Sequence, residues 1–269
     1  NSVAGNHFFR YRTYSAGLGA FTSRDPLGYV DGTSLYAGYF GMGMGGDPWG
    51  TKGTDMPAHM RYSCNCGWID TGHMRPDSAE KLWEQVSSVL SPQEAEMQMQ
   101  EGAEKLILYK QSMARGGMEA GIVGQFYVKQ GLEEAQKERV ALYIFWRVSM
   151  QFELLQGEPP WSLATNSSSA EGDLVSNLLG FYMAVRGYTK KQIYEWCDVR
   201  SKTESEHQWK LQGGLGKNYF WTPMLHDYCP VCPGGSRFPE RFREIKPVQD
   251  ADLVRLEGIV GGGPFPRRE

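Results

Sequence analysis

The sequence has few of the side chains that most readily bind metals or act as catalytic bases, with five histidines and five cysteines among 269 residues. It also lacks a long hydrophobic run. The longest, Val140–Val148, contains Arg147 and falls well short of the roughly 18–20 apolar residues needed to cross a bilayer. We therefore expect no transmembrane segment.

An excess of one charge is lacking as well. The chain has 28 Lys and Arg against 31 Asp and Glu, which gives a formal net charge of −3. Such a chain has no global field to attract nucleic acid or an anionic membrane, so no nucleic-acid partner is indicated. With 41% hydrophobic and 22% charged residues, the composition is that of an ordinary globular protein without a disorder signature.

Several well-known catalytic motifs are also absent. The chain contains no GxSxG nucleophile elbow, no Walker phosphate loop and no dinucleotide-binding fingerprint. The glycine-rich segment Gly213–Lys217 lacks the spacing of a phosphate loop and is interpreted as a turn. These absences leave scattered polar residues as the candidates for chemistry.

The segment Arg10–Gly50 contains two similar tetrapeptides, Asp25-Pro-Leu-Gly and Asp47-Pro-Trp-Gly, separated by 18 residues. The run YSAGLGAFTSR precedes the first tetrapeptide. This pattern resembles the closing segment of the Rhs repeat-associated core, which ends the β-shell of Rhs and YD-repeat polymorphic toxins. The resemblance covers about the first fifth of the chain.

The resemblance implies that the chain is the C-terminal end of a toxin that is secreted or delivered into a target cell. Its implied partners are the upstream Rhs β-shell and a cognate immunity protein. It further implies self-cleavage near Gly50-Thr51, with Asp25 and Asp47 as an aspartyl-protease-like pair, because two close carboxylates share one proton. The family usually has Leu where this chain has Thr51. Alternatively, the Asp-Pro tetrapeptides only build tight turns.

We expect two domains, with a boundary in the glycine-rich segment at 41–53. Residues 1–50 consist of short β segments at 7–14, 20–23 and 34–39, separated by turn residues. Residues 51–269 form the effector domain, in which helix is expected to dominate 76–200 and irregular structure to follow Gly213. The predicted fold class is α+β, a mainly α-helical effector domain preceded by a short β-rich tail of an Rhs shell core.

Five helices are expected in the effector domain. Pro76 opens one, and Ser91 with Pro92 and Glu94 forms a capping box for the next. The strongest helical pattern covers 131–155, and further helices are expected at 169–185 and 189–199.

The segment Tyr62–Pro76 is the densest in polar and special residues. Asp70 and His73 are three apart, so in a helical turn they would share a face as an acid–base pair or as two metal ligands, and Arg75 follows. The alternative is that Asp70 caps the Pro76 helix and His73 is satisfied by the backbone.

A second cluster lies at the predicted helix entrance around 167–180, with Glu171, Asp173 and Asn177. Capping explains Glu171 but not Asp173 or Asn177, which continue into an apolar helix. Glu153 lies among apolar neighbours, where a carboxylate pairs with a cation or has a raised pKa.

The two patterns xCGWIDxGHxR and SSxExDxxSNxLG resemble stretches of an uncharacterised bacterial domain family. The resemblance covers about 30 residues and implies no known activity. It suggests that one site contains His73, Glu153, Glu171, Asp173 and Asn177.

The cysteines allow more than one interpretation. Cys64, Cys66, Cys229 and Cys232 could supply four thiolates to a structural zinc, with His226 near enough to join. Disulfides between these pairs, or free thiols, are equally compatible with the spacing. The cofactor is thus unknown, with zinc as one candidate.

These features predict a hydrolase-type toxin of unknown substrate, with a His/carboxylate site that a metal could assist. His73 would act as base or ligand, Asp70 would orient it, Glu153 would be its acid/base partner, and Asn177 or Arg75 would bind a developing negative charge. The alternative is a non-catalytic module that binds a receptor or another protein through an exposed aromatic surface formed by Trp161, Tyr219, Phe220 and Trp221.

Overall fold

The chain divides into two compact units, Asn1–Gly53 and Thr54–Glu269. The computed structural model describes residues 2–3, 6–8, 13–15, 20–21, 56–100, 102–115, 118–157, 171–212, 215–225, 229–248 and 252–266. Asp25, Asp47, Trp161 and His226 lie outside these ranges, so the expectations placed on them stay predictions.

The first unit contains an antiparallel sheet in the order β1-β2-β3-β4. Its strands are β1 (Ser2–Val3), β2 (Asn6–Phe8), β3 (Thr13–Ser15) and β4 (Ala20–Phe21). Two strands, β2 and β3, lie where the sequence suggested one extended segment over 7–14.

The second unit begins with a hairpin of β5 (Met60–Ser63) and β6 (Gly67–Asp70), in which Met60 is opposite Asp70. Helices α1 (Asp77–Ser87), α2 (Pro92–Met97), α3 (Glu134–Gly157), α5 (Asp173–Arg186), α6 (Lys190–Cys197) and α7 (Lys202–Gln212) follow along the chain. Strands β7 (Glu104–Arg115), β8 (Met118–Lys129) and β9 (Val254–Pro266) form an antiparallel sheet. A short 3-10 helix, η3 (Glu240–Phe242), precedes β9.

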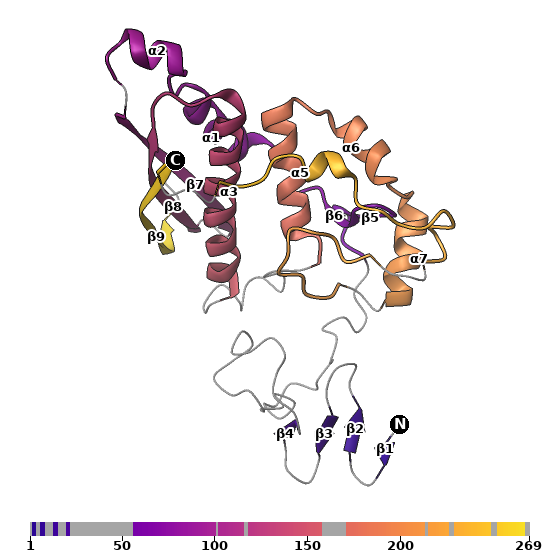
Figure 1. The fold of residues 1–269 in the computed structure, drawn as a ribbon. Helices are drawn as coiled ribbons and strands as arrows, with labels where there is room; N and C mark the ends of the chain where they lie inside the picture. The colour runs from indigo at the N-terminus through magenta and orange to yellow at the C-terminus, as the bar shows by residue number, and fades with distance from the viewer. Residues whose placement is uncertain are drawn as a thin grey trace. The chain divides into compact units, whose positions relative to one another are not determined.

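The elements of the second unit are arranged in layers. Helices α1 and α3 pack on the β7-β8-β9 sheet, and α5 packs against both of them (Figure 1). The other side of α5 contacts β6, and α7 packs on β5. Because α5 lies between the helical layer and the hairpin, its N-terminal turn meets both.

The structure confirms the α+β class, since the described residues form both helices and antiparallel sheets. Helix dominates the described part of 76–200, as expected, but the hairpin β7–β8 also lies inside that range and was not expected. Residues after Gly213 are also not all irregular, since β9 completes the sheet. In β7 the alternation of buried Ile107, Tyr109 and Gln111 with exposed Leu106 and Leu108 is the period-two pattern of a strand.

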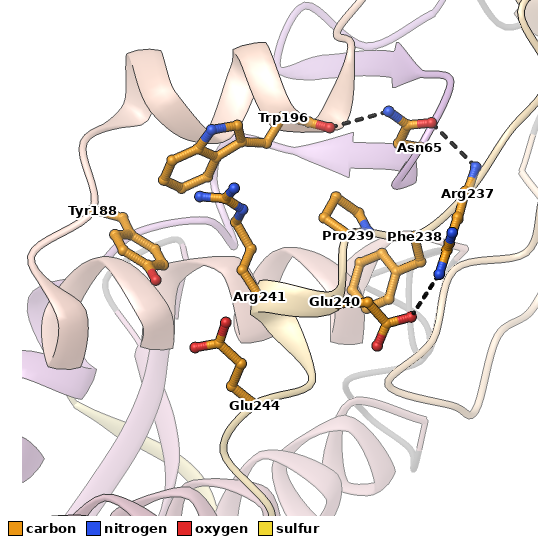
Figure 2. Close-up of a pocket in the computed structure, with 9 residues that line it drawn as sticks. All are labelled: Asn65, Tyr188, Trp196, Arg237, Phe238, Pro239, Glu240, Arg241 and Glu244. Carbon is orange, nitrogen blue, oxygen red and sulfur yellow. Dashed lines mark hydrogen bonds and ion pairs between the residues drawn. The ribbon is translucent and has the colours of Figure 1, made fainter.

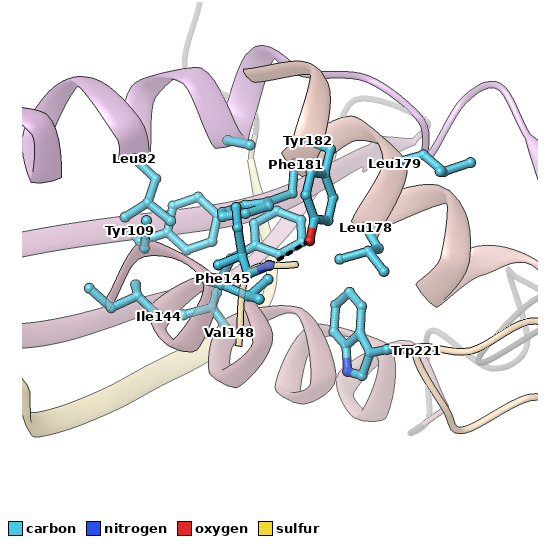
Figure 3. Packing of buried hydrophobic residues seen from close by; sticks show 14 of the residues in the cluster. Leu82, Tyr109, Ile144, Phe145, Val148, Leu178, Leu179, Phe181, Tyr182 and Trp221 are labelled. Atoms are coloured by element: carbon cyan, nitrogen blue, oxygen red, sulfur yellow. Dashed lines mark hydrogen bonds between the residues drawn. The ribbon is translucent and has the colours of Figure 1, made fainter. Parts of the chain in front are cut away.

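The main core lies between the sheet, α1, α3 and α5. Phe145 contacts Phe181 with ring centroids 5.2 Å apart and Trp221 at 5.9 Å, and Tyr109 lies on its other side (Figure 3). A second cluster lies under the β5–β6 hairpin, where Trp68 packs edge-on against Tyr62 and Trp209. Among the described residues no helix is long and apolar enough to cross a membrane.

Candidate active site

The candidate site begins with the contact between β6 and α5. A Cβ atom on Gly172, the N-cap of α5, would lie 2.5 Å from the carbonyl oxygen of Trp68, and one on Gly180 would lie 3.0 Å from that of Arg75. Between them, Ser176 Oγ accepts a hydrogen bond from the amide of Asp70 at 2.8 Å. Residues four apart on α5 therefore hold the segment 68–75 along one face of the helix.

This contact fixes Asp70 at the end of β6. Its Oδ1 accepts hydrogen bonds from the amides of Gly72 at 2.6 Å and His73 at 3.3 Å, which closes the turn after the strand. The turn, rather than a helical face, brings Asp70 and His73 together. Asp70 also does not cap α1, whose N-cap is Pro76.

Three carboxylates surround the imidazole of His73. Nδ1 lies 3.0 Å from Asp70 Oδ2 and 3.8 Å from Asp173 Oδ1, and Nε2 lies 3.9 Å from Glu153 Oε1. The three acids are nearly inaccessible, with side-chain exposures of 9%, 2% and 3%, whereas that of His73 is 26%. The structure thus brings together four of the residues that the sequence singled out, from β6, the following turn, α3 and α5.

The acids control the protonation of His73. Burial disfavours the imidazolium, but the hydrogen bond to Asp70 and the negative charges of Asp173, Asp70 and Glu153 outweigh it and raise the pKa of His73 to about 9. Burial likewise disfavours ionised Asp70, yet the hydrogen bond and charge of His73 and the Gly72 amide lower the pKa of this carboxyl. In the absence of a metal, this raised pKa favours the protonated form of His73 at neutral pH, which can donate a proton.

The same side chains also fit a metal ion. One ligand atom each from Asp70, His73 and Asp173 lies within 4.8 Å of the others. Two carboxylates and an imidazole are oxygen and nitrogen donors that suit zinc, manganese or iron. Metal binding would require His73 in its neutral form, so a cation and the proton on the imidazole compete for the site.

His73 opens into a groove of about 700 Å³ between α1 and β7. Arg75 and Asn177 line the same groove, which places both where they could contact a substrate, although Arg75 also pairs with Asp77 at 2.9 Å. A groove of this size suits a small-molecule ligand.

Two residues depart from the expected site. Glu171 lies elsewhere: its amide donates to the carbonyl of Gly216 at 2.8 Å, and it is not within ion-pair distance of His73. Conversely, His59 was missed, although its Nε2 lies 3.6 Å from Asp70 Oδ2. The feature that could have identified His59 is its place in the hairpin, because residue 59 precedes Met60, which is opposite Asp70.

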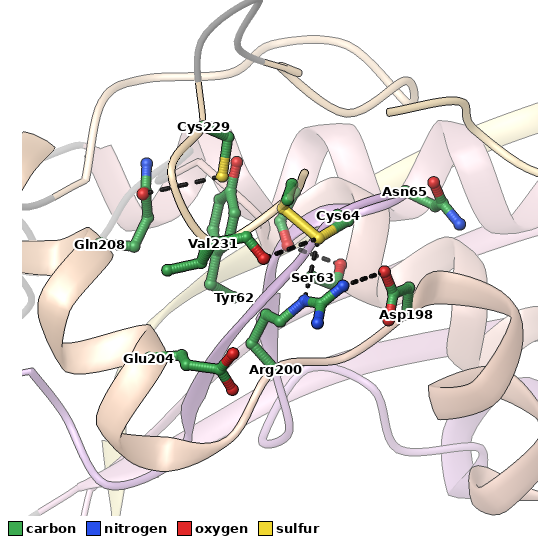
Figure 4. The surroundings of a disulfide bond; sticks show 12 residues. Tyr62, Ser63, Cys64, Asn65, Asp198, Arg200, Glu204, Gln208, Cys229 and Val231 are labelled. Atoms are coloured by element: carbon green, nitrogen blue, oxygen red, sulfur yellow. Dashed lines mark hydrogen bonds and ion pairs between the residues drawn. A yellow bond between two sulfur atoms is a disulfide. The ribbon is translucent and has the colours of Figure 1, made fainter. Parts of the chain in front are cut away.

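The cysteines do not form the four-thiolate zinc site that was one interpretation of their spacing. Cys64 is bonded to Cys232 (Figure 4). Cys66 is bonded to Cys197, so three of the four proposed ligands are oxidised to disulfides. Cys229 is free, with its Sγ 3.8 Å from Gln208 Oε1. The pairing of Cys66 with Cys197 was not expected from the sequence.

A second hollow, of about 600 Å³, lies near α6 and η3. There the guanidinium of Arg241 stacks over Trp196 at 3.7 Å, and Arg237 pairs with Glu240 (Figure 2). Its lining has no histidine and no cluster of buried acids, so it offers less for catalysis than the His73 groove.

No protein-family model matches the chain, and no characterised protein or solved structure shows significant similarity to it.

Proposed function

We propose that Thr54–Glu269 is the effector domain of an Rhs-type polymorphic toxin and acts as a metal-assisted hydrolase. The observation that carries the chemistry is the buried group of Asp70, His73 and Asp173, with Glu153 3.9 Å from His73, at one side of a groove. The toxin context rests on the resemblance of residues 10–50 to the end of an Rhs shell. Two disulfides favour an exported protein, because such bonds persist in oxidising surroundings.

Each residue has a role that its position supports. Asp70, His73 and Asp173 would hold a divalent cation, which supplies Lewis acidity and lowers the pKa of water. Glu153 is the remaining buried carboxylate near His73 and would accept a proton. Asn177, on the groove wall, would donate a hydrogen bond to the developing negative charge.

The alternative function, a non-catalytic binding module, has less support. It requires an open aromatic surface, yet Trp221 is buried and stacks on Trp146 with centroids 5.2 Å apart. Of the expected aromatic residues, Phe220 is 65% exposed. Among the expected aromatic residues that the structure describes, no other ring is fully exposed, and scattered exposed rings are common on protein surfaces.

Toxicity in a cell that expresses the chain tests the proposal. His73→Ala should reduce toxicity by about 100-fold or more, since general acid–base or metal chemistry contributes at least that factor. His207→Ala is the matched control, because His207 is exposed on α7 and lies outside the groove. Full toxicity of a folded His73→Ala protein would contradict the assignment.

A further inference from the structure

Three of the five cysteines lie together in the hydrophobic cluster under the β5–β6 hairpin. Cys64 directly follows β5 and is bonded to Cys232, while Cys229 precedes Cys232 by three residues and has a free thiol. Within the cluster, Cys64 and Cys232 are buried, whereas Cys229 is partly exposed. A free thiol therefore lies close in the chain to a disulfide that solvent scarcely reaches.

The chain between Cys229 and Cys232 forms a turn that suits a bond between them. The amide of Cys232 donates a hydrogen bond to the carbonyl of Cys229 at 3.0 Å, which closes a four-residue turn. Pro230 occupies the second position, where proline fixes the backbone in the conformation that such turns need. A turn of this kind keeps its end Cα atoms within about 7 Å, and disulfides join Cα atoms about 4.4–6.8 Å apart. A bond between Cys229 and Cys232 would thus require only a local rearrangement.

The thiol of Cys229 has polar neighbours. Its Sγ lies 3.8 Å from Gln208 Oε1, which accepts a weak hydrogen bond from the S–H (Figure 4). The Tyr62 hydroxyl is also a neighbour, and its pKa is raised by burial and then by the contact with Cys229. The hydroxyl therefore stays protonated and can donate a hydrogen bond to the Cys229 thiolate, which is the nucleophilic form of the thiol.

The far end of the disulfide has a cation beside it. Arg200 Nε lies 3.0 Å from Cys64 Sγ, and an ion pair with Asp198 holds the guanidinium in place (Figure 4). Thiol–disulfide exchange is faster when the departing sulfur has a lower pKa, and a neighbouring guanidinium stabilises a thiolate. Arg200 therefore makes Cys64 a good leaving group.

We propose that Cys229, Cys232 and Cys64 form a site of internal thiol–disulfide exchange. The Cys229 thiolate attacks Cys232 Sγ, the new S–S bond forms as the Cys64–Cys232 bond breaks, and the electron pair leaves on Cys64 Sγ beside Arg200. The proton that Cys229 loses to water is balanced by the one that Cys64 can take up, so no oxidant or reductant is consumed. The exchange replaces a cross-link over 168 residues by one over three, and β5 is then no longer bonded to the segment before η3.

Disulfide mapping of the intact, oxidised chain tests this exchange. The chain is incubated without added thiol at about pH 8.5, where an ordinary thiol is half ionised. Samples are quenched with acid, labelled at free thiols with N-ethylmaleimide, digested and analysed by mass spectrometry. We expect a Cys229–Cys232 bond and label on Cys64, both increasing with time. The Cys66–Cys197 bond should stay intact and serves as the internal reference.

Two variants test the roles of the thiol and the cation. Cys229→Ser should show neither the new bond nor label on Cys64. Arg200→Gln should slow the labelling of Cys64 by about threefold or more, because an opposite charge lowers the pKa of a departing thiol by about one or more and such a thiol leaves faster. Arg237→Gln is the matched control and should not slow it, because the Arg237 side chain is 84% exposed and pairs with Glu240.

Three results would contradict the exchange as proposed. The parent chain could keep the Cys64–Cys232 bond and label on Cys229 at all times. A Cys64–Cys229 bond could form instead, which would make Cys232 the leaving group. Label could also reach Cys64 as fast in Arg200→Gln as in the parent chain. The exchange uses no residue of the His73 site, so none of these results bears on the proposed hydrolase.

Discussion

His73 is the residue on which the proposed chemistry depends, and its surroundings give it two alternative states. Asp70 accepts a hydrogen bond at 3.0 Å from a protonated imidazole, while Asp173 and Glu153 lie within 4 Å on either side. A proton on the ring or a divalent cation beside it can each offset the three carboxylates. We expect the second state to be the active one, because it leaves Glu153 available as a proton acceptor.

The proton-bound state predicts a pH-dependent stability. The pKa of His73 is raised from an ordinary 6.5 to about 9, so the folded state binds the proton more tightly than the unfolded chain. The stabilisation of the folded state by this proton is fully present below about pH 6.5 and is lost as the pH rises through about 9. Urea unfolding in a chelator should therefore show a loss of up to about 3 kcal/mol over this window.

His73→Gln is the control for this measurement, since it keeps a polar side chain but cannot titrate. Its unfolding free energy should change much less between pH 6.5 and 9. An equal loss of stability in both proteins would assign the pH dependence to other groups.

At the scale of elements, the contact of β6 with α5 assembles the site. Gly172 has φ +108°, and an added Cβ would lie 2.5 Å from Trp68 O. Gly172→Ala should therefore destabilise the fold by more than backbone strain alone would, about 3 kcal/mol or more. It should also impair activity, because it would displace Asp173 from Asp70. Thermal unfolding and the toxicity assay check both effects.

Gly187→Ala is the matched control. Gly187, the C-cap of α5, also has a positive φ, +66°, but nothing lies within 4 Å of its added Cβ. This substitution should destabilise the fold by only about 1 kcal/mol, which is the cost of holding alanine in the left-handed conformation, and should leave activity intact. If the two variants behave alike, the close approach of Gly172 to Trp68 does not hold β6 in place.

Helices with local signals could be predicted from the sequence, and long strands could not. The capping box of Ser91 and Glu94 is present in α2, and Pro76 precedes α1 as expected. The strands β7 and β8 were overlooked because Gly121 and Gly124 interrupt the apolar alternation of β8, and β9 ends in a run of glycines. Strand pairing depends on a partner far along the chain, which a local pattern does not reveal.

The residues of the candidate site divide in the same way, into those with a local sequence signal and those that depend on distant parts of the chain. Asp70 and His73 were predictable as a pair because a turn joins them, and Glu153 because its neighbours are apolar. The proximity of His59 to Asp70 depends on the β5–β6 register. The position of Glu171 away from His73 depends on its contact with the 215–216 loop. Both are tertiary contacts. The spacing of the cysteines could not reveal that Cys197 on α6 pairs with Cys66.

At the scale of the whole molecule, the disulfides join segments that are far apart in the chain. Cys66–Cys197 closes a separation of 131 residues and Cys64–Cys232 one of 168. Loops of this length restrict the unfolded chain strongly, so the double variant Cys66→Ser/Cys197→Ser should lose about 2–5 kcal/mol. Denaturant unfolding measures the loss, with the free-thiol variant Cys229→Ser as control.

If both cysteine variants unfold at the same denaturant concentration as the parent chain, the disulfide does not stabilise the second unit. The self-cleavage ascribed to Asp25 and Asp47 stays a prediction, since both residues lie outside the described ranges.

The most direct test of the account is the binding of a divalent cation to the intact, oxidised chain at pH 7.5. Calorimetric titration with Mn²⁺ or Zn²⁺ should give one site per chain, which Asp173→Asn weakens by about tenfold or more and Glu96→Gln, an exposed control on α2, leaves unchanged. Equal binding by the parent chain and Asp173→Asn, or no stoichiometric binding by either metal, would contradict the metal-assisted site.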